Sequence, residues 1–135
     1  MFHFSIELTV KDNDVNPRQH VSYDKYFLFF QEARIAYFAK FGYNFDGTGR
    51  IGVIAADARC AYKKELRLGD VIEVKCSVGE MKPKSFIMGF LIFREDQICA
   101  EGSATFLAFD YGSGKVIPFP DQLVEAIKSY EGLVG

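Results

Sequence analysis

The residues best suited to chemistry lie in a polar loop from Asp12 to Tyr23, which carries the carboxylate of Asp14, the amide of Asn16 and the imidazole of His20. Carboxylate and imidazole groups can take up protons or attack an electrophilic carbon. The loop runs directly into an apolar segment with helical periodicity. Its side chains therefore reach a helix N-terminus, where free backbone N–H groups and the positive end of the helix dipole lie. We expect any chemistry of this chain to occur there.

The segment after the loop predicts a buried helix. Its apolar residues recur at spacings of three and four, and further apolar residues fill most of the remaining faces. A helix that is apolar almost all round packs inside a structure instead of lying on its surface. Ser22 or Asp24 can cap its start, and Gly42 can end it. The recurring positions are Tyr26, Phe29, Phe30, Ala33, Tyr37, Lys40 and Phe41.

Strands are expected on both sides of this helix. The segment from Phe2 to Val10 alternates apolar and polar residues, which predicts a half-buried antiparallel strand. The run from Gly52 to Leu66 is also compatible with a helix, but it stands among strands and is interpreted as one. Three further strands are expected to form an antiparallel meander, over residues 71–81, 85–94 and 97–109.

The glycines inside the meander and a short closing helix complete the prediction. Gly79, Gly89 and Gly102 are expected to mark bulges or close backbone packing. Asp121 is expected to cap a helix from Gln122 to Tyr130. A sheet that has one apolar helix to cover must wrap around it, and its exposed edges favour dimerisation.

Composition limits the function classes. The chain has 135 residues and is 49% hydrophobic, with fourteen Phe and seven Tyr, which is enough for one domain with a full core. Its net charge of −2 does not indicate the basic surface that nucleic-acid-binding proteins have. Cys60, Cys76 and Cys99 show no disulfide or zinc pattern, so free thiols in a reducing compartment are expected. Without a signal peptide or a transmembrane run, a soluble cytoplasmic protein is expected.

Five short motifs follow one another along the chain. They are Asp12-Asn-Asp-Val-Asn16, Gln19-His-Val-Ser-Tyr23, Phe30-Gln-Glu-Ala-Arg34 after Tyr26, Leu66-Arg-Leu-Gly-Asp70 and Gly114-Lys-Val-Ile-Pro-Phe-Pro120. In this order they resemble the hot-dog fold thioesterases of the 4-hydroxybenzoyl-CoA thioesterase and YbgC type, and the related plant acyl-ACP thioesterases. The resemblance covers nearly the whole chain and implies a single α+β domain over residues 1–135. It implies about five antiparallel strands wrapped around one long central helix, with a short C-terminal helix.

The resemblance also implies an activity and partners. The protein would be a hydrolase that cleaves the thioester of acyl-CoA or acyl-ACP, with a coenzyme A thioester as substrate and no cofactor or metal. It would form a homodimer or homotetramer, without nucleic acid and without a membrane span. The alternative is a non-catalytic dimer of the same fold that binds acyl-CoA or serves as a scaffold.

The catalytic register depends on an insertion. Asp14, Asn16 and His20 match the Asp, Asn and His of the acyl-ACP branch if Pro17 and Arg18 are a two-residue insertion. Without that gap, Asn16 takes the place of the catalytic Asp, and an amide cannot act as base or nucleophile. We favour the gapped register, because Asp-Val-Asn and Gln-His-Val stay intact in it.

In this register the roles follow from the chemistry of thioester hydrolysis. Asp14 would be the nucleophile or general base, while Asn16 and His20 position water or the carboxylate. Asp14 and Asn16 could instead only hold an Asx turn, and His20 could only cap a backbone group. The N–H groups of Val21, Ser22 or Tyr23 would polarise the thioester oxygen.

Charged residues outside the loop have two interpretations each. Glu32 matches an acidic position of the family helix, and it either pairs with Arg34, which we favour, or lines a cavity. Five cations could meet the phosphates of a coenzyme A arm, although solvated surface is the more common role of such residues. They are Arg18, Arg50, Lys63, Lys82 and Lys84.

Overall fold

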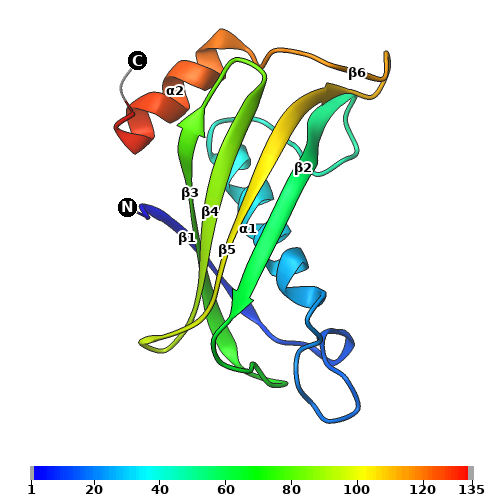
Figure 1. Ribbon diagram of the computed structural model, residues 1–135, viewed down its shortest axis with the longest axis vertical. Coiled ribbons are helices and arrows are strands. Elements are labelled where there is room, and N and C mark those ends of the chain that lie inside the picture. Colours follow the sequence, from blue (N-terminus) through cyan, green and yellow to red (C-terminus); the bar gives the residue numbers. More distant parts are fainter. Residues whose placement is uncertain (1, 134–135) are drawn as a thin grey trace.

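The computed structural model describes residues 2–133 as a curved antiparallel sheet with two helices (Figure 1). Its strands run in the order β1-β3-β4-β5-β2, and β6 pairs with β5. The elements are β1 (Phe4–Thr9), the 3₁₀ turn η1 (Asp12–Asp14), α1 (Lys25–Lys40), β2 (Ile51–Tyr62), β3 (Val71–Met81), β4 (Ser85–Arg94), β5 (Gln97–Asp110), β6 (Lys115–Val116) and α2 (Asp121–Glu131).

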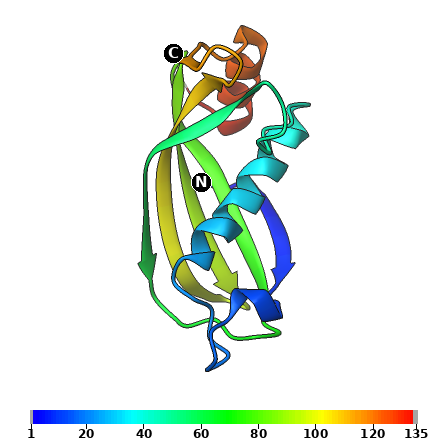
Figure 2. The ribbon, with the colours of Figure 1, turned by 90° about the vertical axis from the view of Figure 1, so that its right-hand side faces the viewer.

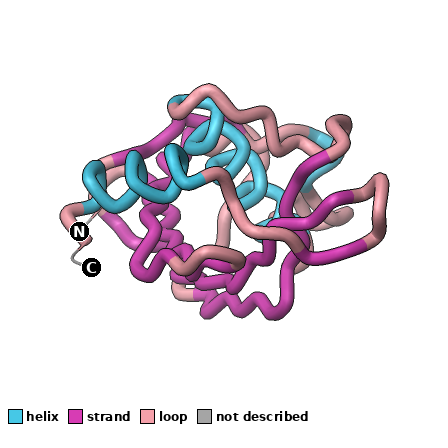
Figure 3. Tube along the Cα trace, turned by 90° about the horizontal axis from the view of Figure 1, so that it is seen from above, coloured by secondary structure: helices cyan, strands magenta, loops and turns pink. Residues whose placement is uncertain are grey.

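The predicted antiparallel meander is confirmed, with two corrections. The sheet has six strands instead of about five, because the two-residue β6 after Gly114 is too short to leave a pattern in the sequence. The central helix has sixteen residues, about 24 Å, which is an ordinary length. It lies along one face of the sheet (Figure 2), and the strands curve around it when the molecule is seen from above (Figure 3). None of the helices within residues 2–133 is long and apolar enough to cross a bilayer.

The ends of the helices match the predicted caps in part. Asp24 is the N-cap of α1 but makes no capping hydrogen bond through its side chain, and Ser22 instead accepts the Lys25 N–H through its carbonyl. Gly42 follows the C-terminus with a φ of +89°, as expected of a terminating glycine. The N-cap of α2 is Pro120 and not Asp121, which is the first residue of the helix.

One side of α1 is buried and the other is open. Its buried residues pack against the sheet, whereas Leu28, Gln31 and Glu32 on the outer side are exposed, Leu28 by 45%. The prediction that α1 is buried on most faces is therefore wrong for this chain. The buried set is Tyr26, Phe29, Phe30, Ala33, Arg34, Tyr37 and Phe38.

Gly102 lets α1 approach the sheet. A Cβ atom on Gly102 would overlap the ring of Phe30, which stacks on Phe90 with a centroid distance of 4.6 Å. Gly79 lies at a register shift between Val78 and Glu80, so it marks a bulge as expected. The core thus brings the first turns of α1 directly over β4 and β5.

Candidate active site

The polar loop forms a small hairpin between β1 and α1. Val15 and Val21 form a bridge, and the Asn16 N–H donates to the His20 carbonyl at 2.8 Å. The Asn16 Oδ1 accepts the N–H groups of Arg18, at 2.9 Å, and His20, at 3.2 Å. Residues 17–19 form the tip of this hairpin, with Gln19 at a φ of +67°. Pro17 and Arg18, the residues of the expected insertion, thus lie outside the Val15–Val21 bridge.

Asp14 lines a cleft beside the first turns of α1. Its Oδ2 accepts the Lys11 N–H at 2.9 Å, and its carbonyl accepts the Ser22 N–H at 3.2 Å. The cleft has a volume of about 240 Å³, and Glu32 lies on its helix side. Two of the predicted site residues, Asp14 and Glu32, are therefore brought together. The other lining residues are Leu8, Thr9, Lys11, Asn13, Leu28, Phe29 and Gln31.

Asn16 and His20 do not line this cleft. The Asn16 amide oxygen is turned into its own hairpin, as the Asx-turn interpretation expects. The His20 Nδ1 lies 2.8 Å from the Glu65 Oε2, and Arg67 contacts the other oxygen of Glu65 at 2.8 Å. The hydrogen bond from Arg67, followed by the charge of His20, lowers the pKa of Glu65. These contacts hold the hairpin against the segment that follows β2.

The backbone donors at the helix start are mostly engaged. The Val21 N–H donates to the Leu66 carbonyl at 2.8 Å, and the Ser22 N–H donates to Asp14. Among the three predicted donors, only the N–H of Tyr23 has no acceptor within residues 2–133. The exposed Tyr23 ring lines a second hollow, of about 290 Å³, together with Tyr62 and Lys63. The Tyr62 hydroxyl donates to the Tyr23 carbonyl at 2.8 Å.

An aromatic pocket of about 150 Å³ lies between α1 and strands β2, β4 and β5. Phenylalanines form much of its wall, and its polar lining residues are Gln31, Arg34 and Ser103. Gln31 also lines the cleft that holds Asp14, so the two spaces share one residue. The sequence contained Gln31 within the Phe30–Arg34 motif, but nothing in the motif assigned it to a pocket. The remaining lining residues are Phe27, Phe30, Ala55, Ala58, Phe90, Ala104 and Phe106.

The proposed phosphate contacts fall into two groups. Arg18 and Lys63 belong to the loop end of the molecule, where Lys63 lies 3.3 Å from Glu101. Lys82 and Lys84 belong to the β3–β4 turn, which lies beside α2 at the opposite end of the sheet (Figure 1). Lys82 lies 3.8 Å from Glu80.

Arg50 precedes β2 at that same end and makes two hydrogen bonds to Asp110, at 2.9 and 3.2 Å. The hydrogen bond from Arg50 lowers the pKa of Asp110. Because the two groups lie at opposite ends, the five cations of one chain are not arranged around one coenzyme A arm.

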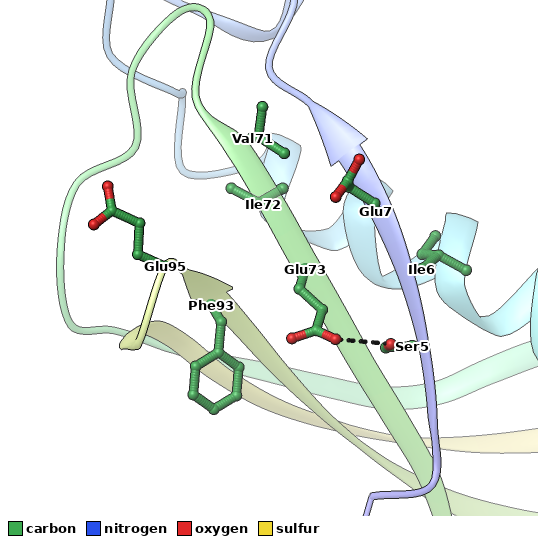
Figure 4. Close-up of a pocket in the computed structure, with 8 residues that line it drawn as sticks. All are labelled: Ser5, Ile6, Glu7, Val71, Ile72, Glu73, Phe93 and Glu95. Atoms are coloured by element: carbon green, nitrogen blue, oxygen red, sulfur yellow. Dashed lines mark hydrogen bonds between the residues drawn. The ribbon is translucent and has the colours of Figure 1, made fainter.

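A larger hollow, of about 650 Å³, lies on the outer face of the sheet, where Glu7, Glu73 and Glu95 line it (Figure 4). The Ser5 hydroxyl donates to Glu73 at 2.9 Å. Strand alternation places Ser5, Glu7 and Glu73 opposite the side chains that pack on α1. Three carboxylates would repel a phosphate-bearing ligand. This hollow is therefore separate from the candidate site.

Known proteins share this architecture. Residues 10–127 match the family described as the thioesterase-like superfamily. A protein of Aquifex aeolicus named "Putative esterase" is 28% identical over 110 residues, which are 80% of this chain and 84% of that protein.

Solved structures show the same likeness. A hypothetical protein from Aquifex aeolicus has a TM-score of 0.84 and 25% identity, covering 93% of this chain and 99% of the other. A gentisyl-coenzyme A thioesterase also gives a TM-score of 0.84, at 23% identity and with coverage of 92% and 99%. The fold is the hot-dog fold, and the chain belongs to the thioesterase-like superfamily.

Proposed function

We propose that the protein hydrolyses the thioester bond of acyl-CoA where the aromatic pocket meets the Asp14 cleft. Family membership and the similarity in fold to a coenzyme A thioesterase support this reaction class. The observation that carries the proposal is that Gln31 lines both spaces. An acyl group in the aromatic pocket would bring its thioester past Gln31 toward the two carboxylates.

Asp14 is the proposed base or nucleophile. Its Oδ2 is held by the Lys11 N–H, whereas its Oδ1 has no hydrogen-bond partner within the described chain. In the base route, Oδ1 takes a proton from water as the water oxygen bonds to the thioester carbon. The C–S bond then breaks, and the coenzyme A thiolate takes up the proton. In the nucleophilic route, Oδ1 bonds to the carbon and expels the thiolate, and water then hydrolyses the mixed anhydride.

Donors for the developing oxyanion come from two positions in this proposal. The N–H of Tyr23 has no acceptor within residues 2–133, and the Gln31 amide group adds a side-chain donor at the junction of the two spaces. Asn16 and His20 act indirectly. Asn16 closes the hairpin tip, and His20 fixes the hairpin to Glu65, so that Asp14 keeps its place beside α1.

A second copy of the chain is the proposed partner. The twelve-residue β2 is an edge strand with an exposed centre, and long exposed edges require a cover. Antiparallel pairing of β2 with its own copy, centred on Ala58, places Asp57 opposite Arg59 in both halves. The same pairing brings Arg50 of the second copy to the loop end of this chain. Cations from both ends would then surround one coenzyme A arm.

Asp14→Asn tests the mechanism, with Asp12→Asn as its matched control. Both residues belong to η1, but Asp12 is exposed and does not line the cleft. We expect Asp14→Asn to lower kcat for acyl-CoA hydrolysis by roughly 10²–10⁴-fold, the usual contribution of a catalytic base. Asp12→Asn should retain wild-type activity. Thiol release across a panel of acyl-CoA substrates provides the measurement.

Two results would contradict this proposal. Unchanged activity of Asp14→Asn would exclude Asp14 from the reaction. Tight retention of acyl-CoA by the wild-type protein without turnover of any substrate would instead select the non-catalytic acyl-binding dimer.

A further inference from the structure

We infer that the aromatic pocket accepts a short acyl group with a carboxylate at the end remote from the thioester, and that Arg34 binds this carboxylate. This inference rests on the proposed function, because it assigns the aromatic pocket to the acyl group. It adds a substrate class that the fold and the family do not specify.

Arg34 is a buried cation without an anionic partner. Arg34 is only 8% exposed, and its Nη1 donates to the Phe45 carbonyl at 3.0 Å. The guanidinium carbon lies 5.3 Å from the centroid of the Phe106 ring. No carboxylate pairs with Arg34 within residues 2–133. Burial lowers its pKa, yet a guanidinium stays protonated in proteins.

The other guanidinium nitrogens are free to bind a ligand. A guanidinium carries about five N–H donors, and Phe45 takes only one of them. Within the described residues, every fully enclosed side-chain nitrogen or oxygen has a hydrogen-bond partner. The unused nitrogens of Arg34 are therefore not fully enclosed, and Arg34 is one of the residues that line the aromatic pocket.

The charge of Arg34 favours an anion over a neutral group. A desolvated cation without a counter-charge is costly, and a carboxylate both neutralises it and accepts two parallel hydrogen bonds. A hydroxyl group would leave the charge uncompensated. The phenylalanine walls lower the polarity around this contact and so strengthen the attraction. The Ser103 hydroxyl supplies a further donor in the same space.

The pocket volume limits the length of the acyl group. A cavity of about 150 Å³ holds one molecule the size of benzene, so roughly six heavy atoms fit beyond the thioester carbonyl. Three methylene groups and a carboxylate meet this limit. Glutaryl-CoA is therefore a suitable probe, and pentanoyl-CoA has the same chain without the charge.

The test compares kcat/KM for these two substrates in wild-type protein, Arg34→Met and Lys115→Met. Methionine keeps an unbranched apolar stem like that of arginine without the charge, and Lys115 is an exposed cation on β6 that lines neither pocket. We expect wild-type protein to prefer glutaryl-CoA by about 10–100-fold, the usual effect of a charged hydrogen-bonding site. Arg34→Met should abolish this preference mainly by losing activity on glutaryl-CoA. Lys115→Met should keep the preference.

Binding separates this inference from the proposed hydrolysis. Calorimetric titration of Asp14→Asn with each acyl-CoA, with and without Arg34→Met, measures the same preference in the absence of turnover. A failure of hydrolysis with the preference in binding intact would overturn the catalytic proposal alone. If Arg34→Met changes both substrates by the same factor, or wild-type protein shows no preference, Arg34 only anchors the Phe45 carbonyl and the inference fails. Arg34→Lys, which keeps the charge, should retain part of the preference if it folds.

Discussion

The Glu131 carboxylate joins three elements at the end of the molecule remote from the loop. Its Oε2 accepts the Tyr37 hydroxyl at 2.6 Å and the Val78 N–H at 3.0 Å, so it links α1, β3 and α2. Burial, followed by the hydrogen bond to Glu131, raises the pKa of Tyr37, which keeps the hydroxyl protonated as a donor. A half-buried carboxylate that loses a donor also loses part of the compensation for its desolvation.

Tyr37→Phe tests this junction. We expect the variant to lose about 1–2 kcal/mol of unfolding free energy, because it removes one hydrogen bond to a charged acceptor. Tyr43→Phe is the control, since the half-buried Tyr43 hydroxyl makes no hydrogen bond within the described residues. Urea denaturation of both variants provides the measurement. Equal losses in the two variants would show that the Glu131 link does not stabilise the fold.

The lowered pKa of Glu65 predicts that the stability contributed by the hairpin contacts depends on pH. Its pKa lies below the ordinary value of 4.5, chiefly because of the hydrogen bond from Arg67. A carboxyl group whose pKa falls on folding stabilises the folded state above its ordinary pKa, and this contribution disappears as the pH falls through the lower folded value. The melting temperature of Glu65→Gln should therefore be below that of wild-type protein at pH 7, and the difference should vanish at strongly acidic pH.

Glu125→Gln on the exposed side of α2 is the matched control for this measurement. It should show no such convergence with wild-type protein. A constant difference for Glu65→Gln at every pH would contradict the prediction.

At the scale of elements, Gly102 sets the distance between α1 and the sheet. Gly102→Ala would force its Cβ into the Phe30 ring, which Phe90 supports from the other side. We expect a loss of about 1–3 kcal/mol of unfolding free energy, as for other overpacked cores.

Gly89→Ala is the matched control, because its new Cβ would lie 3.7 Å from Phe2, an ordinary contact. Denaturation midpoints should separate the two variants. Similar midpoints would show that Phe30 can move aside without cost.

The same elements show what the sequence could predict. Alternation over β1 and the turns at Lys82–Lys84 and Glu95–Asp96 located the strands, because those patterns are local. The contacts of Glu32 and Arg34 could not be predicted from the local sequence. Arg34 donates to the Phe45 carbonyl, and Glu32 lines the Asp14 cleft without pairing to Arg34. The expected structural pair between them was therefore wrong, since tertiary packing placed the two side chains on different sides of α1.

At the scale of the whole molecule, the open sides of α1 and β2 are the surfaces relevant to the proposed dimer. Leu28 is 45% exposed on α1, and the centre of β2 presents two alanines, Asp57, another alanine and Arg59 in succession, all of them exposed. Two-fold pairing makes every contact twice, so a single charge reversal acts twice in a dimer. Asp57 and Arg59 are therefore sensitive reporters of the proposed interface.

Asp57→Arg should dissociate the proposed dimer, because an introduced arginine would face Arg59 of the second copy on both sides of the axis. We expect the dissociation constant to rise by roughly a hundredfold or more, since opposed like charges at an interface cost several kcal/mol. Asp57→Arg combined with Arg59→Asp should restore the dimer by exchanging the two charges. Asp121→Arg makes the same charge change on α2 and should leave assembly unaltered. Light scattering coupled to gel filtration measures the mass of each variant, and an unaltered dimer mass for Asp57→Arg alone would exclude this pairing register.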